Sequence, residues 1–182
     1  MIYLSYLNSP LGRITLTSDG EALIGLAFEQ EAHPRDRSGA IEQPLPLLID
    51  AERQLQEYLG NWRKSFDIPL RPAGTPFQQE VWKQLCEIPF GQTISYTELA
   101  NRMGKEKAVR AVGMANGRNP ISILIPCHRV IGASGNLTGY GGGLWRKEFL
   151  LRHEGALTTK ISQQALFENP ASLKEKSADF TD

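Results

Sequence analysis

The sequence predicts an α+β fold in two parts, and three observations support this prediction. Residues 1–72 contain short strand patterns bounded by turn residues, followed by one helical pattern. Residues 73–155 contain several short helical patterns with capping residues or glycine at their ends. Between them, residues 71–74 (Arg-Pro-Ala-Gly) are the best linker candidate. We therefore expect an N-terminal domain over 1–72, a mostly helical C-terminal domain over 73–155 and an extension over 156–182.

The composition is that of an ordinary globular protein: 41% of the 182 residues are hydrophobic and 22% are charged. The longest apolar stretch, 121–125, is far shorter than the ~20 residues that span a membrane, so we expect no membrane partner. Cys86 and Cys127 are the only cysteines, too few for a disulfide framework or a four-cysteine zinc site. We expect a cytoplasmic protein without a metal ion or cofactor.

The charge is unevenly distributed although the formal net charge is zero. Residues 73–155 carry 10 Lys and Arg against 6 Asp and Glu, whereas residues 1–72 carry 7 against 10. A polyanionic partner would therefore meet the C-terminal part of the chain.

The expected N-terminal elements are strands, a loop and one helix. Three strand patterns are separated by turn-rich segments, at 2–8, 13–17 and 22–28. The polar segment 33–46 contains three prolines and fits a loop. Residues 47–59 carry apolar residues at helical spacing, Tyr58 among them, and Gly60 ends the pattern. Residues 67–70 are expected to return as a further strand.

The C-terminal part begins with a helix and continues with a helix pair. Thr75 and Pro76 form a good helix start, and Cys86 lies beside the apolar face of that helix, where we expect a small core residue. A capping box from Ser95 to Glu98 opens a helix over 96–103, and a glycine-containing turn leads to a second helix over 107–115. This is the helix-turn-helix pattern. Basic residues around it favour DNA binding over a purely structural helix pair: Arg102, Lys105, Lys107, Arg110 and Arg118.

Residues 121–125 are expected to form a short buried strand that runs directly into Cys127 and His128. A cysteine beside an imidazole in such a place is a candidate activated thiol, because free cysteine has a pKa of about 8.5 and needs a base or a positive field. A buried, inert cysteine is the alternative. Neighbouring residues on a strand point to opposite faces, so we expect His128 to reach the sulfur of Cys127 only through water or a backbone turn.

A glycine-rich loop at 138–143 and a helix over 144–153 follow. The loop lacks the Gly-Lys end of a phosphate loop and the spacing of a dinucleotide fingerprint. Its glycines would let backbone N–H groups approach a flat ligand, although a plain surface loop is the alternative. Glu154 lies in the last turn of the helix, where the dipole disfavours a carboxylate. We therefore expect Glu154 to have a partner, and His128 is the best candidate.

Together these residues resemble the O6-alkylguanine-DNA alkyltransferases, in their bacterial type. The resemblance rests on Pro126-Cys127-His128-Arg129-Val130, on Asn119-Pro120 upstream of the thiol, on the glycine-tyrosine loop and on His153-Glu154-Gly155. It runs over 75–155 without interruption and is diffuse over 1–74. It implies a ribonuclease-H-like N-terminal sheet with a helix, which we interpret as structural, and a C-terminal domain with a helix-turn-helix and an active-site cysteine.

The resemblance also implies a DNA repair reaction with a single turnover. Cys127 matches the thiol that irreversibly accepts the alkyl group from guanine O6 after the base is flipped out of double-stranded DNA. His128 matches the base that deprotonates the thiol through water, and Glu154 matches the carboxylate that orients His128. Tyr96 matches a hydrogen-bond donor to guanine N3. Arg110 matches the arginine that fills the gap in the duplex, with its helix in the minor groove.

Further residues match the binding pocket and its hinge. Asn119 matches the hinge asparagine, Tyr140 the pocket wall and Gly141 a backbone donor toward O6. The carbonyl of Val130, with that of Cys127, would accept from the exocyclic amine of guanine. Ser122 stands where some members of the family have proline, which affects the alkyl sizes that fit. We expect the protein to act as a monomer.

Two other classes of function remain open from the residues alone. One is a helix-turn-helix regulator in which Cys127 senses alkylation or oxidation, which would need a dimer interface. The other is a Cys-His hydrolase, which would need the imidazole of His128 in direct contact with sulfur and would turn over repeatedly.

Overall fold

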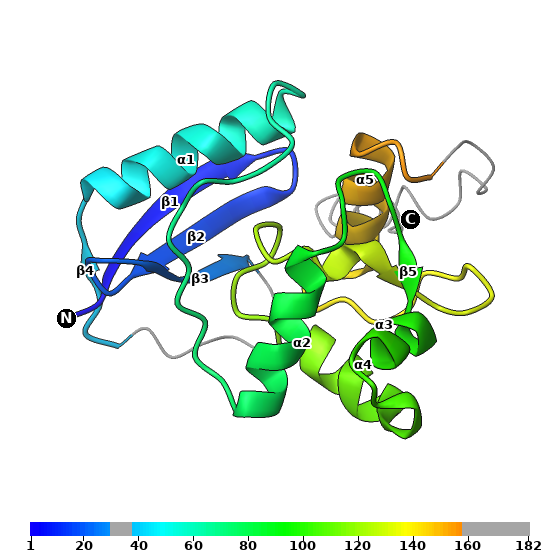
Figure 1. Cartoon of the computed structure of the whole chain (residues 1–182). Coiled ribbons are helices and arrows are strands. Elements are labelled where there is room, and N and C mark those ends of the chain that lie inside the picture. The colour runs from blue at the N-terminus through cyan, green and yellow to red at the C-terminus, as the bar shows by residue number, and fades with distance from the viewer. Residues whose placement is uncertain (30–37, 158–182) are drawn as a thin grey trace, which may run out of the picture.

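The computed structural model describes residues 1–29 and 38–157. Residues 33–37 of the predicted loop, and the predicted extension from residue 158 onward, lie outside the described residues. Figure 1 shows the arrangement: a sheet covered by one long helix forms one side of the molecule, and a group of shorter helices forms the other.

The N-terminal sheet contains four strands in the order β3-β2-β1-β4. Strands β1 (Tyr3–Ser9), β2 (Gly12–Ser18) and β3 (Leu23–Phe28) form an antiparallel meander, and the short β4 (Ile41–Glu42) pairs in parallel with β1. Helix α1 (Pro46–Leu59) packs on this sheet (Figure 1). The three predicted strands and the helix are confirmed.

The predicted strand over 67–70 is wrong. Only Leu70 pairs with the sheet, through an isolated parallel bridge to Leu23. The N–H of Leu23 donates to the carbonyl of Pro69 at 2.8 Å, and the N–H of Arg71 donates to the carbonyl of Leu23 at 2.9 Å. The pairing of this segment with the sheet extends no further. Pro69 lacks an N–H donor, and proline at this place keeps a strand from extending.

The C-terminal part starts with α2 (Pro76–Cys86), which has the expected cap: Thr75 accepts from the N–H of Gln78, and the Gln78 side chain accepts from the N–H of Thr75. The buried face of α2 includes Val81, Trp82 and Leu85. Cys86 is exposed, so its assignment to the core is wrong. It follows Leu85 directly, and one residue turns a helix by about 100° away from the buried face.

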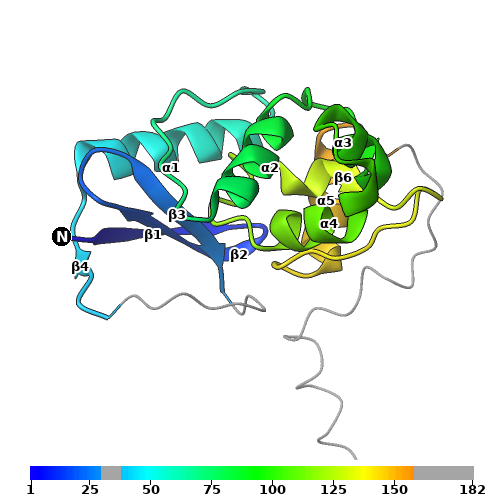
Figure 2. The same ribbon diagram turned by 60° about the horizontal axis from the view of Figure 1, so that its bottom comes forward.

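The predicted helix pair is present with shifted boundaries. Helix α3 (Tyr96–Arg102) is capped by Ser95, but the carboxylate of Glu98 bonds Arg102 and completes no capping box. A short 3₁₀ turn, η1 (Glu106–Ala108), leads into α4 (Val109–Gly117). Figure 2 shows α3 and α4 next to each other at the end of the molecule away from the sheet.

The predicted strand over 121–125 is a turn. Ile121 forms one isolated bridge to Leu26, after which the N–H of Leu124 bonds the carbonyl of Ser122, and Ile123 has a φ of 72°. Because these hydrogen bonds are local, no ladder forms beyond the bridge. The chain continues as η2 (Cys127–Arg129) and β6 (Val130–Ile131), which pairs in parallel with β5 (Ile94–Ser95).

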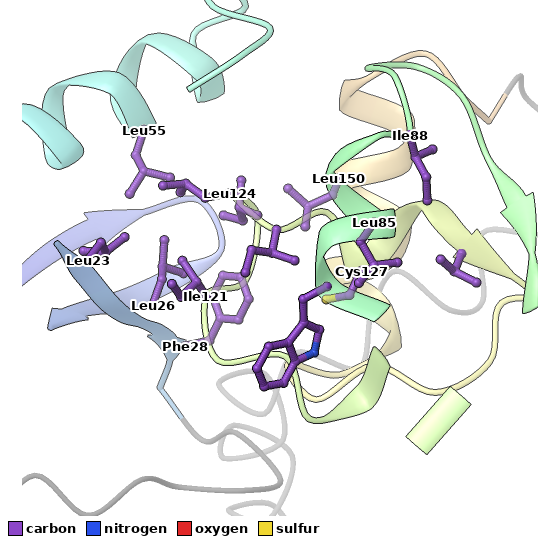
Figure 3. Close-up of a cluster of buried hydrophobic side chains, with 14 of the residues drawn as sticks. Leu23, Leu26, Phe28, Leu55, Leu85, Ile88, Ile121, Leu124, Cys127 and Leu150 are labelled. Carbon is purple, nitrogen blue, oxygen red and sulfur yellow. The ribbon is translucent and has the colours of Figure 1, made fainter. Parts of the chain in front are cut away.

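Helix α5 (Leu144–His153) has the bounds that were predicted for it, and the described residues continue to 157. One hydrophobic cluster joins the two parts of the molecule (Figure 3). It runs from Leu26 on β3 through Ile121 and Leu124 to Leu150 on α5 and to Cys127. Over the described residues, no helix has the length and apolar character that a membrane span requires.

Candidate active site around Cys127

Cys127 is the first residue of η2, and its side chain is buried, with 4% of the residue exposed. The side-chain amide of Asn119 donates to its sulfur at 3.0 Å and to the carbonyl of Ile125 at 2.7 Å. The Oδ1 of Asn119 accepts from the N–H of Ile121 at 3.0 Å, which fixes the orientation of the amide. The turn before the cysteine is therefore held by the same side chain that contacts the thiol.

His128 and Glu154 meet as expected: the Nε2 of His128 lies 2.9 Å from Oε1 of Glu154, and both side chains are buried. Burial lowers the pKa of His128, more strongly than the hydrogen bond to Glu154 raises it. The neutral imidazole therefore carries its proton on Nε2, toward the carboxylate. Its Nδ1 is buried and has no hydrogen-bond partner among the described residues, so it is available as an acceptor.

Glu154 receives more donors than the sequence predicted. The hydroxyl of Tyr58 donates to Oε1 at 2.7 Å, and the Arg129 guanidinium donates to both oxygens at 2.9 Å. The N–H of Gly91 donates to Oε2 at 3.2 Å. The hydrogen bonds from His128 and Arg129 outweigh burial and hold the pKa of Glu154 far below its usual range. The carboxylate is an anion that orients its neighbours.

Gly91 fits this site because of its backbone. Its φ is 76°, and an added Cβ would lie 2.8 Å from the backbone oxygen of Glu154. A side chain would therefore clash with the chain that carries the carboxylate.

Tyr96 and Lys147 meet at one backbone carbonyl at the start of the glycine loop. The hydroxyl of Tyr96 and the ammonium of Lys147 both donate to the carbonyl of Thr138, at 3.2 and 2.7 Å. Burial raises the pKa of Tyr96, so its hydroxyl stays protonated. Lys147 is fully buried, and burial lowers its pKa to about 8, while the neighbouring Cys127 acts in the opposite direction. This cation was not predicted from the sequence.

The residues expected to line a pocket are found in two places. Val130 and Ser122 are buried on either side of Cys127 along the chain. Tyr140 and Gly141 are half-buried in the glycine loop, where the Tyr140 ring packs against Phe28 with 6.3 Å between ring centroids. The sheet thus supports the loop that was expected to form the pocket wall.

The residues expected to contact DNA divide between a surface and the site. Lys107 on η1, Arg110 on α4 and Arg118 at the end of α4 are all exposed. Met114, also on α4, is 60% exposed. Asn119 lies inward, beside the sulfur.

No group of three or more metal-binding side chains occurs in the described ranges 1–29 and 38–157. Four residues of the site were predicted from the sequence: Cys127, His128, Glu154 and Tyr96. Three others were not: Tyr58, Arg129 and Lys147. Arg129 carried a signal, since it lies beside His128 in the sequence. Tyr58 and Lys147 carried no such sequence signal, because each fits its helical pattern in the same way as the residues around it.

Both parts of the chain resemble known proteins. Residues 2–72 match the family described as 6-O-methylguanine DNA methyltransferase, ribonuclease-like domain, and residues 76–156 match its DNA binding domain. A methylated-DNA–protein-cysteine methyltransferase of Methanosarcina acetivorans is 46% identical over 85% of this chain and 99% of its own. One of Mycobacterium tuberculosis is 46% identical over 85% and 93%.

Solved structures agree with these matches. The crystal structure of Mycobacterium tuberculosis OGT in complex with DNA has a TM-score of 0.80 and 45% identity, covering 85% of this chain and 93% of that one. An O6-methylguanine DNA methyltransferase of Methanococcus jannaschii has a TM-score of 0.60 and 26% identity, covering 87% and 98%. The chain belongs to the 6-O-methylguanine DNA methyltransferase family.

Proposed function

We propose that Cys127 is the acceptor in this protein's repair reaction, in which the alkyl group on O6 of guanine in DNA moves to a cysteine of the repair protein itself. The observation that carries this assignment is the unpartnered Nδ1 of His128, held beside the cysteine by the bond from Nε2 to Glu154. The other cysteine, Cys86, is exposed on α2, and no histidine adjoins it in the sequence.

The proton of the thiol passes through a water molecule to Nδ1 of His128. The imidazolium that forms is stabilised by the Glu154 carboxylate, which stays ionised because five donor contacts surround it. The thiolate then attacks the alkyl carbon, the carbon–O6 bond breaks, and the electron pair leaves with the guanine. The thioether has no leaving group that water can remove, so each molecule reacts once.

Three donors near the sulfur favour the charged states of this reaction. The Asn119 amide contacts the sulfur, and the buried ammonium of Lys147 acts on it electrostatically. The hydroxyl of Tyr96 is protonated; it donates to the carbonyl of Thr138 in this structure and would turn from it to donate to N3 of the departing guanine. Donors fixed in a buried site stabilise developing negative charge more strongly than water does.

The alkylated base has to leave the duplex, because Cys127 is buried and cannot reach a stacked base. Arg110 is exposed on α4 and is the side chain that would fill the gap. Lys107 and Arg118 would contact phosphates, which requires no particular sequence. Binding from the minor groove suits a lesion that can occur anywhere.

The geometry disfavours the hydrolase alternative. A Cys-His hydrolase needs a direct hydrogen bond between imidazole and thiol, and the Nδ1 of His128 makes no such bond. We also infer a cytoplasmic location, because the sequence contains only two cysteines, too few for a disulfide framework.

Intact-protein mass spectrometry tests the assignment. After mixing with a duplex that carries one O6-methylguanine, the protein is expected to gain one methylene equivalent, roughly 14 Da, on the peptide that contains Cys127. Cys127→Ser is expected to bind the duplex and gain nothing. Methylation of Cys86, or more repaired guanine than protein, would contradict the proposal, and Cys86→Ser serves as the matched control.

A further inference from the structure

Helix α1 of the N-terminal part reaches into the site through one side chain. The hydroxyl of Tyr58 donates to Oε1 of Glu154 at 2.7 Å, across 96 residues of sequence. The same oxygen lies 2.9 Å from Nε2 of His128. We infer that Tyr58 is a positioning residue for alkyl transfer, which holds Glu154 in the orientation that aims Nδ1 of His128 toward the cysteine. This inference rests on the roles proposed above for His128 and Glu154.

The ring of Tyr58 is fixed on several sides, so the position of its hydroxyl is fixed too. The residue is completely buried. Its ring packs against Phe66 at 5.3 Å, against the edge of Phe90 at 6.1 Å and against His153 at 5.0 Å between centroids. Its backbone carbonyl lies 2.7 Å from Nε2 of His153, the last residue of α5. Both ends of Tyr58 therefore attach α1 to the turn that carries Glu154.

The hydroxyl keeps its proton, and so remains a donor, at neutral and mildly alkaline pH. Burial and the neighbouring carboxylate raise the pKa of Tyr58 well above its usual value. The hydroxyl therefore adds positive partial charge at Oε1 of Glu154. Because His128 binds the same oxygen, the Tyr58 bond reduces the negative charge that His128 meets there.

The basicity of His128 depends on this balance. The groups that act on it are the Glu154 carboxylate, which raises its pKa, and Arg129 and Lys147, which lower it. Tyr58 acts indirectly, through the carboxylate. Without the Tyr58 hydroxyl, Oε1 becomes a stronger acceptor for the Nε2 proton. The pKa of His128 then rises, and a larger fraction of it is already protonated, and inactive as a base, at a given acidic pH.

A Tyr58→Phe variant tests the inference, because it removes the hydroxyl and keeps the ring. Single-turnover transfer from a methylated duplex is measured across roughly pH 5 to 8, where histidines titrate. We expect the rate near neutral pH to fall about tenfold, the size of one lost hydrogen bond to a charged group. We also expect the acidic limb of the profile to shift to higher pH.

Leu48→Ala is the matched control. It removes buried packing from α1 ten residues before Tyr58, and it leaves the Tyr58 ring and hydroxyl unchanged. It is expected to lower the unfolding temperature and to keep the wild-type pH profile. If Tyr58→Phe behaved like Leu48→Ala, with lower stability and an unshifted profile, Tyr58 would be structural only and the inference would be wrong.

A second measurement does not depend on deleting the hydroxyl. Replacing Tyr58 by 3-fluorotyrosine makes the hydroxyl a stronger donor, so the acidic limb should move to lower pH, opposite to Tyr58→Phe. The nitrogen chemical shifts of His128 report the same change directly. If the wild-type protein gains no alkyl group on Cys127, the proposed function is wrong. If Cys127 is alkylated but neither Tyr58 variant shifts the pH profile of the transfer rate, only the inference about Tyr58 is wrong.

Discussion

The side-chain amide of Asn119 donates to the sulfur of Cys127 at 3.0 Å while its own oxygen accepts from the backbone N–H of Ile121 at 3.0 Å. One side chain therefore shapes the turn before Cys127 and supplies a donor to its sulfur. A donor directed at sulfur favours the thiolate over the thiol, because the charged form accepts the stronger hydrogen bond.

Replacing Asn119 by aspartate should reverse this contribution. The carboxylate still accepts from Ile121 but places negative charge, rather than a donor, against the sulfur. We expect Asn119→Asp to slow single-turnover transfer by at least about tenfold, more than Asn119→Ala does. Affinity for unmethylated duplex should change little in the alanine variant, since Asn119 lies inward from the exposed basic residues. A transfer rate higher in Asn119→Asp than in Asn119→Ala would refute the role of the donor.

The buried pair of His128 and Glu154 predicts how stability depends on acid. The folded pKa of Glu154 lies far below its usual 4.5, so its contribution is present above that value and is lost as the pH falls. The folded pKa of His128 lies below its usual 6.5, so the unfolded chain takes up a proton that the folded protein does not. Both effects lower the free energy of unfolding on acidification, and the histidine acts first.

Urea unfolding at a series of pH values measures this. We expect stability to begin falling as the pH drops through about 6.5, with a steeper fall near the carboxylate range. In His128→Asn the first part of the decline should disappear and the second should remain. A wild-type curve that is flat down to the carboxylate range would show that His128 is protonated in the folded protein.

The sequence predicted the regular elements better than the turns. Helix 144–153 was found at Leu144–His153 because its boundaries have local causes: Gly143 and Gly155, on its two sides, have φ values of 88° and 73°. The segment 121–125 was predicted as a strand because an apolar run fits a buried strand and a buried turn equally well. The turn forms because the side-chain amide of Asn119 and local backbone hydrogen bonds stabilise it.

The site was predictable only where its residues are close in sequence or stand out in their patterns. Cys127 and His128 are neighbours, and Glu154 stood out by its unfavourable place at a helix end. In the sequence, Tyr58 is one of several apolar residues at helical spacing. Its hydrogen bond to Glu154 depends on how α1 and α5 lie relative to each other in the fold. Contacts of that kind come from tertiary structure, which spacing along one element does not encode.

The lowered pKa of Lys147 leads us to expect that the rate of alkyl transfer declines at alkaline pH. Its pKa of about 8 means that the folded protein loses this buried charge at mildly alkaline pH. We expect the rate to rise with pH as thiolate forms and then to fall above pH 8, when the cation near the sulfur is neutralised. Lys147→Met should be slow throughout and lack the alkaline decline. Lys83→Met, on the exposed side of α2, is the control and should keep the wild-type profile.

Stability should respond to Lys147 in the opposite direction from the rate. Its folded pKa is lower than the usual 10.5, so between pH 8 and 10.5 the unfolded chain binds a proton that the folded protein does not. Stability from this group therefore rises with pH in that window, by about 3 kcal/mol in all. Unfolding measured in alkali should show the rise in wild-type protein and lose it in Lys147→Met.

The exposed position of Arg110 leads us to expect that its substitution affects transfer from duplex DNA more than transfer from single-stranded DNA. Arg110 is exposed on α4, where it can occupy the space that a flipped base leaves in the duplex. A single strand has no stack to hold open, so the unstacking cost of a few kcal/mol is largely absent there. We expect Arg110→Ala to reduce transfer from a methylated duplex by more than about tenfold and from a single strand far less.

Arg118→Ala is the matched control: as a phosphate contact, Arg118 should contribute equally to both substrates, so its loss should weaken binding to both similarly and reduce the salt dependence of binding. Equal losses on both substrates for Arg110→Ala would make Arg110 a phosphate contact as well and leave the flipped base without a replacement from this helix.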